Sequence, residues 1–240
     1  MSNEVSTLWD RYWKKDRSLF SVVYDKIAVF YRTVIIDQAV SRIGERFYPN
    51  HALILHAGCG SGATDIPLQQ HARVVALDIS MEALKVYRNL HPGHNEQVQA
   101  DILRMPLRDD SLDGLLSIGV VEHFEADELP GLFREHGRVV RPGGYLIVLW
   151  PPIWGLSVMG LALAERVVGL MLRRSIRLHP PEPTKYRSRK QVQSFLDTSE
   201  LELVESRFSW RDAFTHQFVV LRKSGKCSQE DLAENPRQFR

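Results

Sequence analysis

The sequence predicts an α/β fold, because apolar runs typical of buried strands are separated by segments with helical periodicity. The clearest strand, residues 53–57, runs directly into three closely spaced glycines, Gly58, Gly60 and Gly62. Glycine adopts positive backbone angles and leaves bare amides at the N-terminus of the helix that follows. We therefore expect a small-molecule site where this first strand ends.

A second strand, residues 73–77, ends at Asp78. A carboxylate at the C-terminal edge of a strand can accept hydrogen bonds from both hydroxyls of a ribose, which suits an adenosine. The pattern Gly58-x-Gly60-x-x-Ala63 also satisfies the relaxed dinucleotide fingerprint. These features predict a Rossmann-like site for an adenosyl group, but they do not name the cofactor.

Three further segments along the chain are consistent with more strands of the same sheet. Asp101 and Ile102 come after the strand at 98–100, so a second strand edge carries an acid beside an apolar residue. Residues 112–118 form a buried strand. Residues 138–149 combine a helix end, a tight Pro-Gly-Gly turn and a fifth strand.

These segments resemble the class I S-adenosylmethionine-dependent methyltransferases, in particular the branch that includes the quinone and small-molecule methyltransferases. The resemblance extends over residues 50–150, where the motifs occur in the family's order and at its intervals. The motifs are the glycine loop, Asp78, Asp101-Ile102, Val121-Glu122-His123-Phe124 and Arg141-Pro142-Gly143-Gly144. The family implies an α/β, Rossmann-like, seven-stranded, mostly parallel sheet with helices on both faces and an antiparallel edge strand. Residues 201–208 and 214–221 would be its last two strands.

The resemblance also implies S-adenosyl-L-methionine as cofactor and gives roles to residues along the strand ends. Gly58, Cys59 and Gly60 would line the methionine end of the cofactor, and Asp78 would bind the ribose. The remaining contacts would be Ile79 on adenine, Asp101 on the adenine amino group, Ile102 on the ring, and Ser117 and Ile118 under the sulfonium. For Ile79 and Ile102 the alternative is plain core packing.

One position departs from the family's pattern. Two residues before the first glycine of the loop, where the family usually carries Asp or Glu, this chain has His56. That acid helps to fix the cofactor's ammonium group and the loop. A neutral histidine can accept one hydrogen bond, whereas a protonated one would repel both the ammonium and the sulfonium. We expect cofactor affinity to fall at acidic pH, unless His56 is a strand-end residue with no electrostatic role.

His123, just beyond the fourth strand, is the best candidate for a general base. The sulfonium is already electrophilic, so the protein has to position the acceptor and remove a proton from it. Histidine titrates near neutral pH, and Glu122 is expected to orient His123. The alternative is that Glu122 and His123 only cap a helix over residues 127–138, and His179 is a weaker rival base.

The chain divides into three predicted parts: an N-terminal helical cover at 1–50, a methyltransferase domain at 51–223 with an insertion at 151–186, and a polar tail at 224–240. Helices are expected from residue 8 and over 22–36. The aromatic residues Trp9, Tyr12, Trp13 and Tyr24 are candidates for covering the cofactor, although aromatics at this spacing are also typical of core packing.

The insertion joins an apolar stretch to a cluster of basic residues. Glu165 and Arg166 interrupt the stretch, and their insertion cost outweighs the gain from the apolar residues, which argues against a membrane span. A lid over the acceptor pocket, a protein interface, or peripheral membrane contact through residues 153–190 remain as alternatives. Membrane contact would use the arginines at 173, 174 and 177.

Composition narrows the class of partner. The net charge is +2, too small to indicate a nucleic-acid partner, so none is expected. The two cysteines, Cys59 and Cys227, have no disulfide or metal-ligand spacing; we expect no metal and a cytoplasmic location, or a peripheral one at the inner face of a membrane. The oligomeric state is not predicted.

The sequence therefore predicts transfer of a methyl group from S-adenosylmethionine to a small-molecule or lipid-like acceptor, at oxygen. One alternative is a nicotinamide-dependent short-chain reductase, because Tyr186-x-x-x-Lys190 matches that family's catalytic pair, although in the wrong context. The other is a non-catalytic S-adenosylmethionine-binding protein of the same fold.

Overall fold

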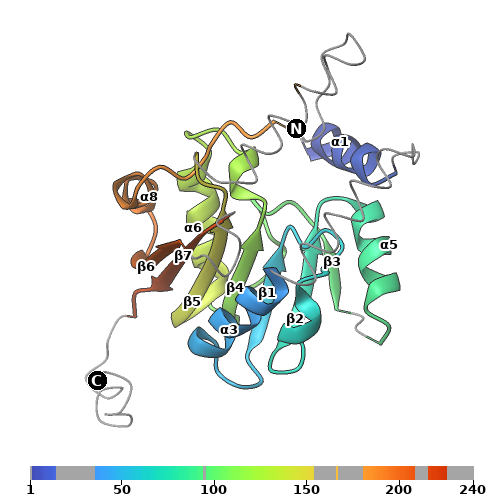
Figure 1. The fold of residues 1–240 in the computed structure, drawn as a ribbon, viewed down its shortest axis with the longest axis horizontal. Coiled ribbons are helices and arrows are strands. Elements are labelled where there is room, and N and C mark those ends of the chain that lie inside the picture. The colour runs from blue at the N-terminus through green and yellow to red at the C-terminus, as the bar shows by residue number, and fades with distance from the viewer. Residues whose placement is uncertain are drawn as a thin grey trace.

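The computed structural model describes residues 2–14, 36–93, 96–153, 166, 181–208 and 216–225. Within these residues seven strands form one sheet in the order β3-β2-β1-β4-β5-β7-β6 (Figure 1). The strands are β1 (Leu53–Ala57), β2 (Arg73–Asp78), β3 (Gln97–Gln99), β4 (Leu112–Ile118), β5 (Val140–Trp150), β6 (Leu201–Phe208) and β7 (Gln217–Lys223).

The sheet is mostly parallel, which confirms the predicted fold class. The first five strands pair in parallel, and β7 runs antiparallel to both β5 and β6. The chain builds β1, β2 and β3 outward and then returns to place β4 on the other side of β1. The strand order therefore reverses between β1 and β4, and in open α/β sheets ligands bind at this reversal, outside the carboxyl ends of the strands.

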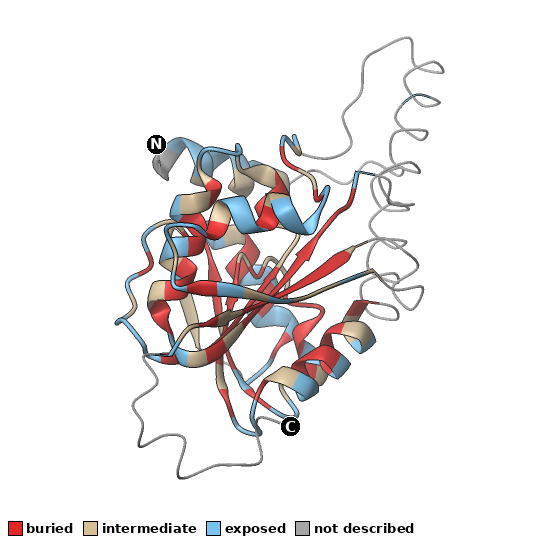
Figure 2. Cartoon of the chain, turned by 90° about the vertical axis from the view of Figure 1, so that its left-hand side faces the viewer, coloured by how far each residue is buried: buried red, intermediate tan, exposed pale blue. Residues whose placement is uncertain are grey.

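Helices cover both faces of the sheet because neighbouring residues of each strand point to opposite sides. On one face Ile54 joins a core cluster with Val40 and Ile43 of α3 (Asp37–Phe47). On the other face Leu55 packs in a cluster with helices α6 (Leu129–Val139) and α8 (Arg189–Leu196). Figure 2 shows the buried strands lying between these partly exposed helices.

The glycine loop leads into α4 (Asp65–Leu68), and β2 leads into α5 (Met81–Leu90). The first helix, α1 (Ser2–Lys14), lies beside α5 beyond the C-terminal ends of the parallel strands (Figure 1). The sequence predicted a helix from residue 8; the helix is present but already begins at Ser2. The helix predicted over 22–36 lies outside the described residues except for Ile36, as do most of the insertion and the tail beyond residue 225.

The Pro-Gly-Gly segment differs from the prediction of a tight turn. It lies inside β5, which already begins at Val140. Gly143 has φ +79°, and the register against β4 shifts between Leu112 and Gly114. Turn residues also suit a bulge, because a bulge takes up extra residues while pairing continues on both sides. The prediction of a turn here was therefore wrong.

Candidate active site

The loop after β1 is held against the end of β2. The N–H groups of Gly58 and Cys59 both donate to the Leu77 carbonyl, at 2.8 and 3.0 Å. Gly58 has φ +73°, and a Cβ atom there would lie 2.5 Å from Cγ2 of Val120. Only glycine fits this position without strain. The loop therefore presents bare backbone where the strand order reverses.

Asp78, the last residue of β2, holds the loop from the other side. Its Oδ2 accepts the Gly60 N–H at 2.8 Å, and its Oδ1 accepts the Ser80 N–H at 2.9 Å. Burial raises the pKa of Asp78, and these two N–H donors oppose that rise. Each carboxylate oxygen can accept a second hydrogen bond, so Asp78 can bind two hydroxyls while it holds the loop.

The turn after β3 brings the second acid next to Asp78. The Ala100 N–H donates to the Asp78 carbonyl at 3.1 Å, which places Asp101 at the neighbouring strand end. Ile79 is half-buried there. Ile102 is 7% exposed and belongs to the core cluster on the α6 face, so its contacts agree with the alternative of core packing.

The end of β4 contributes an unpartnered polar group. Ser117 is fully buried, and within the described residues its Oγ has no hydrogen-bond partner. The preceding residue, Leu116, pairs with His56 of β1, so Ser117 and Ile118 lie at the strand end beside the glycine loop. A buried hydroxyl without a partner is costly, and it marks a position where a ligand or water can bind.

His56 does not stand alone at the end of β1. Its Nδ1 lies 2.7 Å from Oδ1 of Asp65, and both side chains are buried. Asp65 is the first residue of α4. The departure at position 56 is thus accompanied by a carboxylate from the next helix, which the sequence analysis did not single out.

His123 lies in the 3₁₀ turn Val121–His123 that follows β4. Its Nδ1 is 2.9 Å from the Pro181 carbonyl. A carbonyl only accepts, so Nδ1 carries a proton and, in the neutral ring, the lone pair is on Nε2. The residues after Pro181 are tied to the same turn, because the Thr184 N–H donates to the Glu122 carbonyl and the Thr184 hydroxyl to the Phe124 carbonyl.

Glu122 was expected to orient His123, but at Nδ1 of that ring the partner is the Pro181 carbonyl. The Glu122 side chain is 3% exposed, and its Oε2 has no hydrogen-bond partner in the described part of the chain. Burial, and to a smaller extent the nearby Glu182, raise the pKa of Glu122 to about 8. This shift favours the neutral form of the Glu122 carboxyl near neutral pH.

Helix α1 contacts both halves of this edge. The Trp9 ring lies edge-on to the His123 ring with centroids 5.0 Å apart, and a Cβ atom at Gly60 would lie 2.9 Å from the Trp13 indole. Asp10 anchors the helix, because it accepts hydrogen bonds from the Ser80 hydroxyl at 2.5 Å and from the Glu82 N–H at 3.3 Å. Tyr24, the fourth aromatic candidate, lies outside the described residues.

Residues 55–148 match the family model of the methyltransferase domain. This segment holds the glycine loop, Asp78, Ser117 and His123. Residues 55–148 thus form a methyltransferase domain of the class I S-adenosylmethionine-dependent type. The cofactor of these methyltransferases is S-adenosylmethionine.

Two curated methyltransferases illustrate the range of relatives. The malonyl-[acyl-carrier protein] O-methyltransferase of Pectobacterium atrosepticum is 34% identical over 51% of this chain and 46% of its own length. The tRNA (carboxymethyluridine(34)-5-O)-methyltransferase of Arabidopsis thaliana is 32% identical over 42% of this chain and 25% of its own length. The matches thus cover less than half of either relative.

The fold extends to solved methyltransferase structures of similar size. Magnesium protoporphyrin IX methyltransferase of Synechocystis PCC 6803, solved with bound SAH, superposes with a TM-score of 0.58 at 18% identity. The superposition covers 93% of this chain and 99% of that one. In the described part of the present chain, no helix has the length and apolar character needed to cross a membrane.

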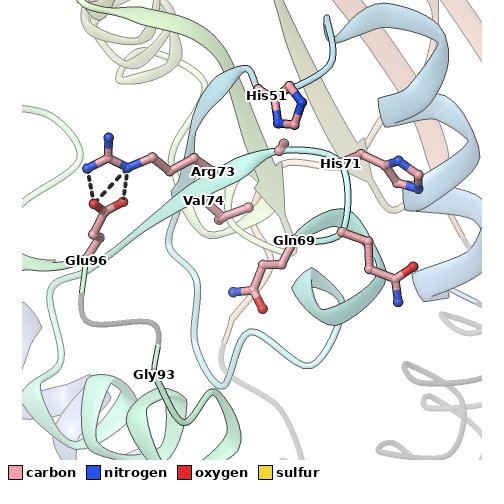
Figure 3. A pocket seen from close by; sticks show the side chains of 9 residues that line it. His51, Gln69, His71, Arg73, Val74, Gly93 and Glu96 are labelled. Carbon is pink, nitrogen blue, oxygen red and sulfur yellow. Dashed lines mark hydrogen bonds and ion pairs between the residues drawn. The ribbon is translucent and has the colours of Figure 1, made fainter.

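Away from this edge, a hollow of about 570 Å³ opens at the opposite ends of β1 and β2 (Figure 3). It is lined by His51, Gln69, Gln70, His71, Ala72, Arg73, Val74, Gly93 and Glu96. Arg73 and Glu96 form an ion pair at its side. Because Arg73 begins the strand that Asp78 ends, this hollow is separate from the candidate active site.

Proposed function

We propose that this chain transfers a methyl group from S-adenosylmethionine to a small-molecule or lipid-like acceptor, at an oxygen atom. One observation carries the proposal. A glycine loop held by a buried strand-end carboxylate and a histidine with one fixed ring nitrogen meet at the same edge of the sheet, joined by α1. The first feature suits the cofactor and the second suits removal of a proton.

The residues at this edge fit the proposed cofactor. Asp78, at the end of β2, can accept hydrogen bonds from both ribose hydroxyls while it holds the Gly60 N–H. The buried Ser117 hydroxyl still lacks a partner among the described residues. When bound, S-adenosylmethionine supplies a methyl group made electrophilic by the sulfonium, so the protein contributes mainly by positioning the acceptor.

His123 is the proposed general base. Its Nδ1–H is held by the Pro181 carbonyl, so Nε2 of the neutral ring would accept the proton that an acceptor hydroxyl loses when methyl transfer releases S-adenosylhomocysteine. The ordinary pKa of histidine suits this exchange near neutral pH. Trp9, edge-on to the ring, limits its rotation. Glu122 supports the turn through its backbone carbonyl, which accepts the Thr184 N–H.

The acceptor class is the least constrained part of the proposal. A relative that methylates an acyl-carrier protein substrate at oxygen supports a lipid-like acceptor. A tRNA methyltransferase among the relatives makes RNA the second candidate. Arg187, Arg189 and Lys190, after the insertion, are exposed and suit either anionic partner.

The reductase alternative has little support from the position of Tyr186. Its hydroxyl lies 2.7 Å from the Ser206 hydroxyl of β6, and the side chain is 6% exposed. In the sheet order β6 lies four strands from β1, whereas a hydride-transferring pair has to reach the cofactor beside the glycine loop. A non-catalytic binding protein of the same fold is the remaining alternative.

The test is incubation of the full chain with methyl-labelled S-adenosylmethionine and a fractionated cell extract. We expect label in the small-molecule or lipid pool. The labelled product should be a methyl ester, which base cleaves, or a methyl ether, which base does not cleave; in both the acceptor atom is oxygen. Label in the RNA pool would replace the proposed acceptor class with nucleic acid. Cofactor binding without label in any pool would favour the non-catalytic protein.

A further inference from the structure

The last residues of the predicted insertion, 181–186, form a strap between two strand ends. On one side the strap pairs with the chain just beyond β5, because the Tyr186 N–H donates to the Pro151 carbonyl at 3.0 Å and the Ile153 N–H donates to the Tyr186 carbonyl at 3.2 Å. On its other side it contacts the 3₁₀ turn that follows β4 and carries His123. The strap therefore joins the ends of β4 and β5 at the candidate active site.

Thr184 makes the contact with this turn through all three of its polar groups. Its N–H donates to the Glu122 carbonyl at 3.2 Å, and its hydroxyl donates to the Phe124 carbonyl at 2.6 Å. These two carbonyls belong to the residues immediately before and after His123. The Thr184 carbonyl accepts the indole N–H of Trp150 at 3.1 Å. Thr184 therefore holds both flanks of the histidine and ties them to the last residue of β5.

The chain between Thr184 and the histidine ring is stiff. The Pro181 carbonyl, which accepts from Nδ1 of His123 at 2.9 Å, lies three residues before Thr184. Proline rings fix φ near about −65° at positions 181 and 183, and Glu182, which precedes a proline, is restricted to extended backbone. With Thr184 held in place, the Pro181 carbonyl has little freedom to leave the ring.

Burial separates the two contacts of the strap. Thr184 is 6% exposed and Trp150 is 0% exposed, so water does not compete for their hydrogen bonds. The contact between Pro181 and His123 is exposed, and water can compete with the carbonyl there. The orientation of the ring thus depends on the buried contacts behind it. Removing a buried donor costs more than removing an exposed one.

We propose that Thr184 is a positioning residue for the general base. By holding the strap against both flanks of His123, it keeps the Pro181 carbonyl on Nδ1 and leaves the lone pair on Nε2. The proposal rests on the proposed function, in which His123 takes the acceptor's proton. A strap that only stabilised the fold would not decide which ring nitrogen of His123 carries the proton.

The experiment is nitrogen-15 NMR of the full chain labelled at histidine, because protonated and unprotonated ring nitrogens have well-separated chemical shifts. Spectra are recorded at about pH 8.5, above the titration range of an ordinary histidine. The His123 signals are those that disappear in His123→Gln. We expect the wild-type proton on Nδ1. Thr184→Val keeps the side-chain shape and removes the hydroxyl, so the ratio of the Nδ1–H form to the Nε2–H form should fall about threefold to tenfold, as for the loss of one hydrogen bond.

Three further variants make the result specific. Thr184→Ser keeps the hydroxyl and should restore the wild-type ratio. Ser206→Ala is the matched control, because the Ser206 hydroxyl contacts the Tyr186 hydroxyl at 2.7 Å, at the end of the strap away from His123, and its loss should leave the ratio unchanged. Trp150→Phe removes the donor to the Thr184 carbonyl and should lower the ratio as well. It serves in place of Thr184→Val if that variant does not fold.

Turnover completes the test, measured with the acceptor pool that the labelled-methyl assay identifies. In Thr184→Val it should fall by the same factor as the tautomer ratio, while the affinity for S-adenosylmethionine is unchanged.

The outcomes separate this inference from the proposed function. An unchanged ratio in Thr184→Val, an equal fall in Ser206→Ala, or no recovery in Thr184→Ser overturns the inference and leaves His123 as the proposed base. A ratio that falls while turnover stays the same overturns the assignment of the base, and the inference with it. A wild-type ring with its proton on Nε2 contradicts both.

Discussion

The two sides of the candidate active site are assembled differently. On the cofactor side the deciding contacts join nearby residues: His56 and Asp65 are 9 positions apart, and Gly60 and Asp78 are 18 apart. On the catalytic side His123 is fixed by Pro181, 58 positions further along the chain. The first side follows from consecutive strand–loop units, whereas the second exists only when distant segments meet.

This difference predicts that the two sides respond separately to mutation. Changes beside the glycine loop should alter cofactor affinity, because those residues contact the cofactor in the proposed function. Changes around His123 should alter turnover, because that ring receives the acceptor's proton. A variant that altered both equally would show that the two sides are one unit.

The largest expected effect is on the catalytic side. His123→Ala should lower turnover about 10²–10⁴-fold, the usual contribution of a general base, while S-adenosylmethionine affinity stays within about twofold of wild type. Turnover is measured with the labelled-methyl assay and affinity by calorimetry. A parallel loss of affinity would mean that His123 supports the fold of the site instead.

A buried histidine that belongs to neither side of the site should affect only the free energy of unfolding. His136 in α6 is fully buried, and within the described residues neither ring nitrogen has a hydrogen-bond partner. Burial lowers the pKa of His136 to about 4, so between pH 6.5 and 4 the unfolded chain binds a proton that the folded chain does not. The free energy of unfolding should therefore fall by about 3 kcal/mol across this range.

His136→Leu should remove that part of the pH dependence and leave turnover at pH 7.5 unchanged. Urea unfolding of both proteins at pH 7 and pH 4.5 measures it. If the two proteins lose the same free energy of unfolding between these pH values, His136 takes up a proton in the folded state and its environment has been misjudged.

On the cofactor side, Asp78→Ala should weaken binding of S-adenosylmethionine by about 1.5–3 kcal/mol, the value of one hydrogen bond to a charged group, or more if both ribose hydroxyls lose their acceptor. Calorimetry measures the change. Because Asp78 also holds Gly60, the thermal midpoint should be compared with that of Asp78→Asn, which keeps one acceptor for the loop. Unchanged affinity in both variants would remove the ribose from this position.

The smallest expected effects come from two tryptophans of α1, one on the catalytic side and one on the cofactor side. Trp9→Leu removes the edge-on contact with His123 and should lower turnover about twofold to tenfold, as for the loss of an aromatic pair. Trp13→Leu removes the indole next to Gly60 and should change cofactor affinity by a similar factor instead. The same result for both variants would show that α1 acts only as a general cover.

The same contrast explains how far the sequence could be interpreted alone. The α/β class, the glycine loop and the position of Asp78 follow from strand patterns and glycine chemistry, which act over short distances along the chain. The seven-stranded sheet with its antiparallel edge was implied by the resemblance to the family. Asp65 was missed because an acid in the first turn of a helix is common for electrostatic reasons alone. Pro181 and Trp9 could not be connected to His123, because no pattern in the sequence encodes which distant segments meet.

The Pro-Gly-Gly segment shows a different limit. Gly143 and Gly144 suit both a tight turn, which the sequence predicted, and a bulge inside β5, which the structure has. Only the pairing partner, β4, decides between them.

The general base assigned to His123 and the roles of the cofactor-side residues stay predictions that binding and turnover measurements can test.

The most direct measurement of the central claim is equilibrium titration of the full chain with S-adenosylmethionine and, separately, with NADPH. The account predicts saturable binding of one S-adenosylmethionine per chain, weakened by Asp78→Ala, and no binding of NADPH. Saturable NADPH binding, or S-adenosylmethionine binding that Asp78→Ala leaves unchanged, would contradict it.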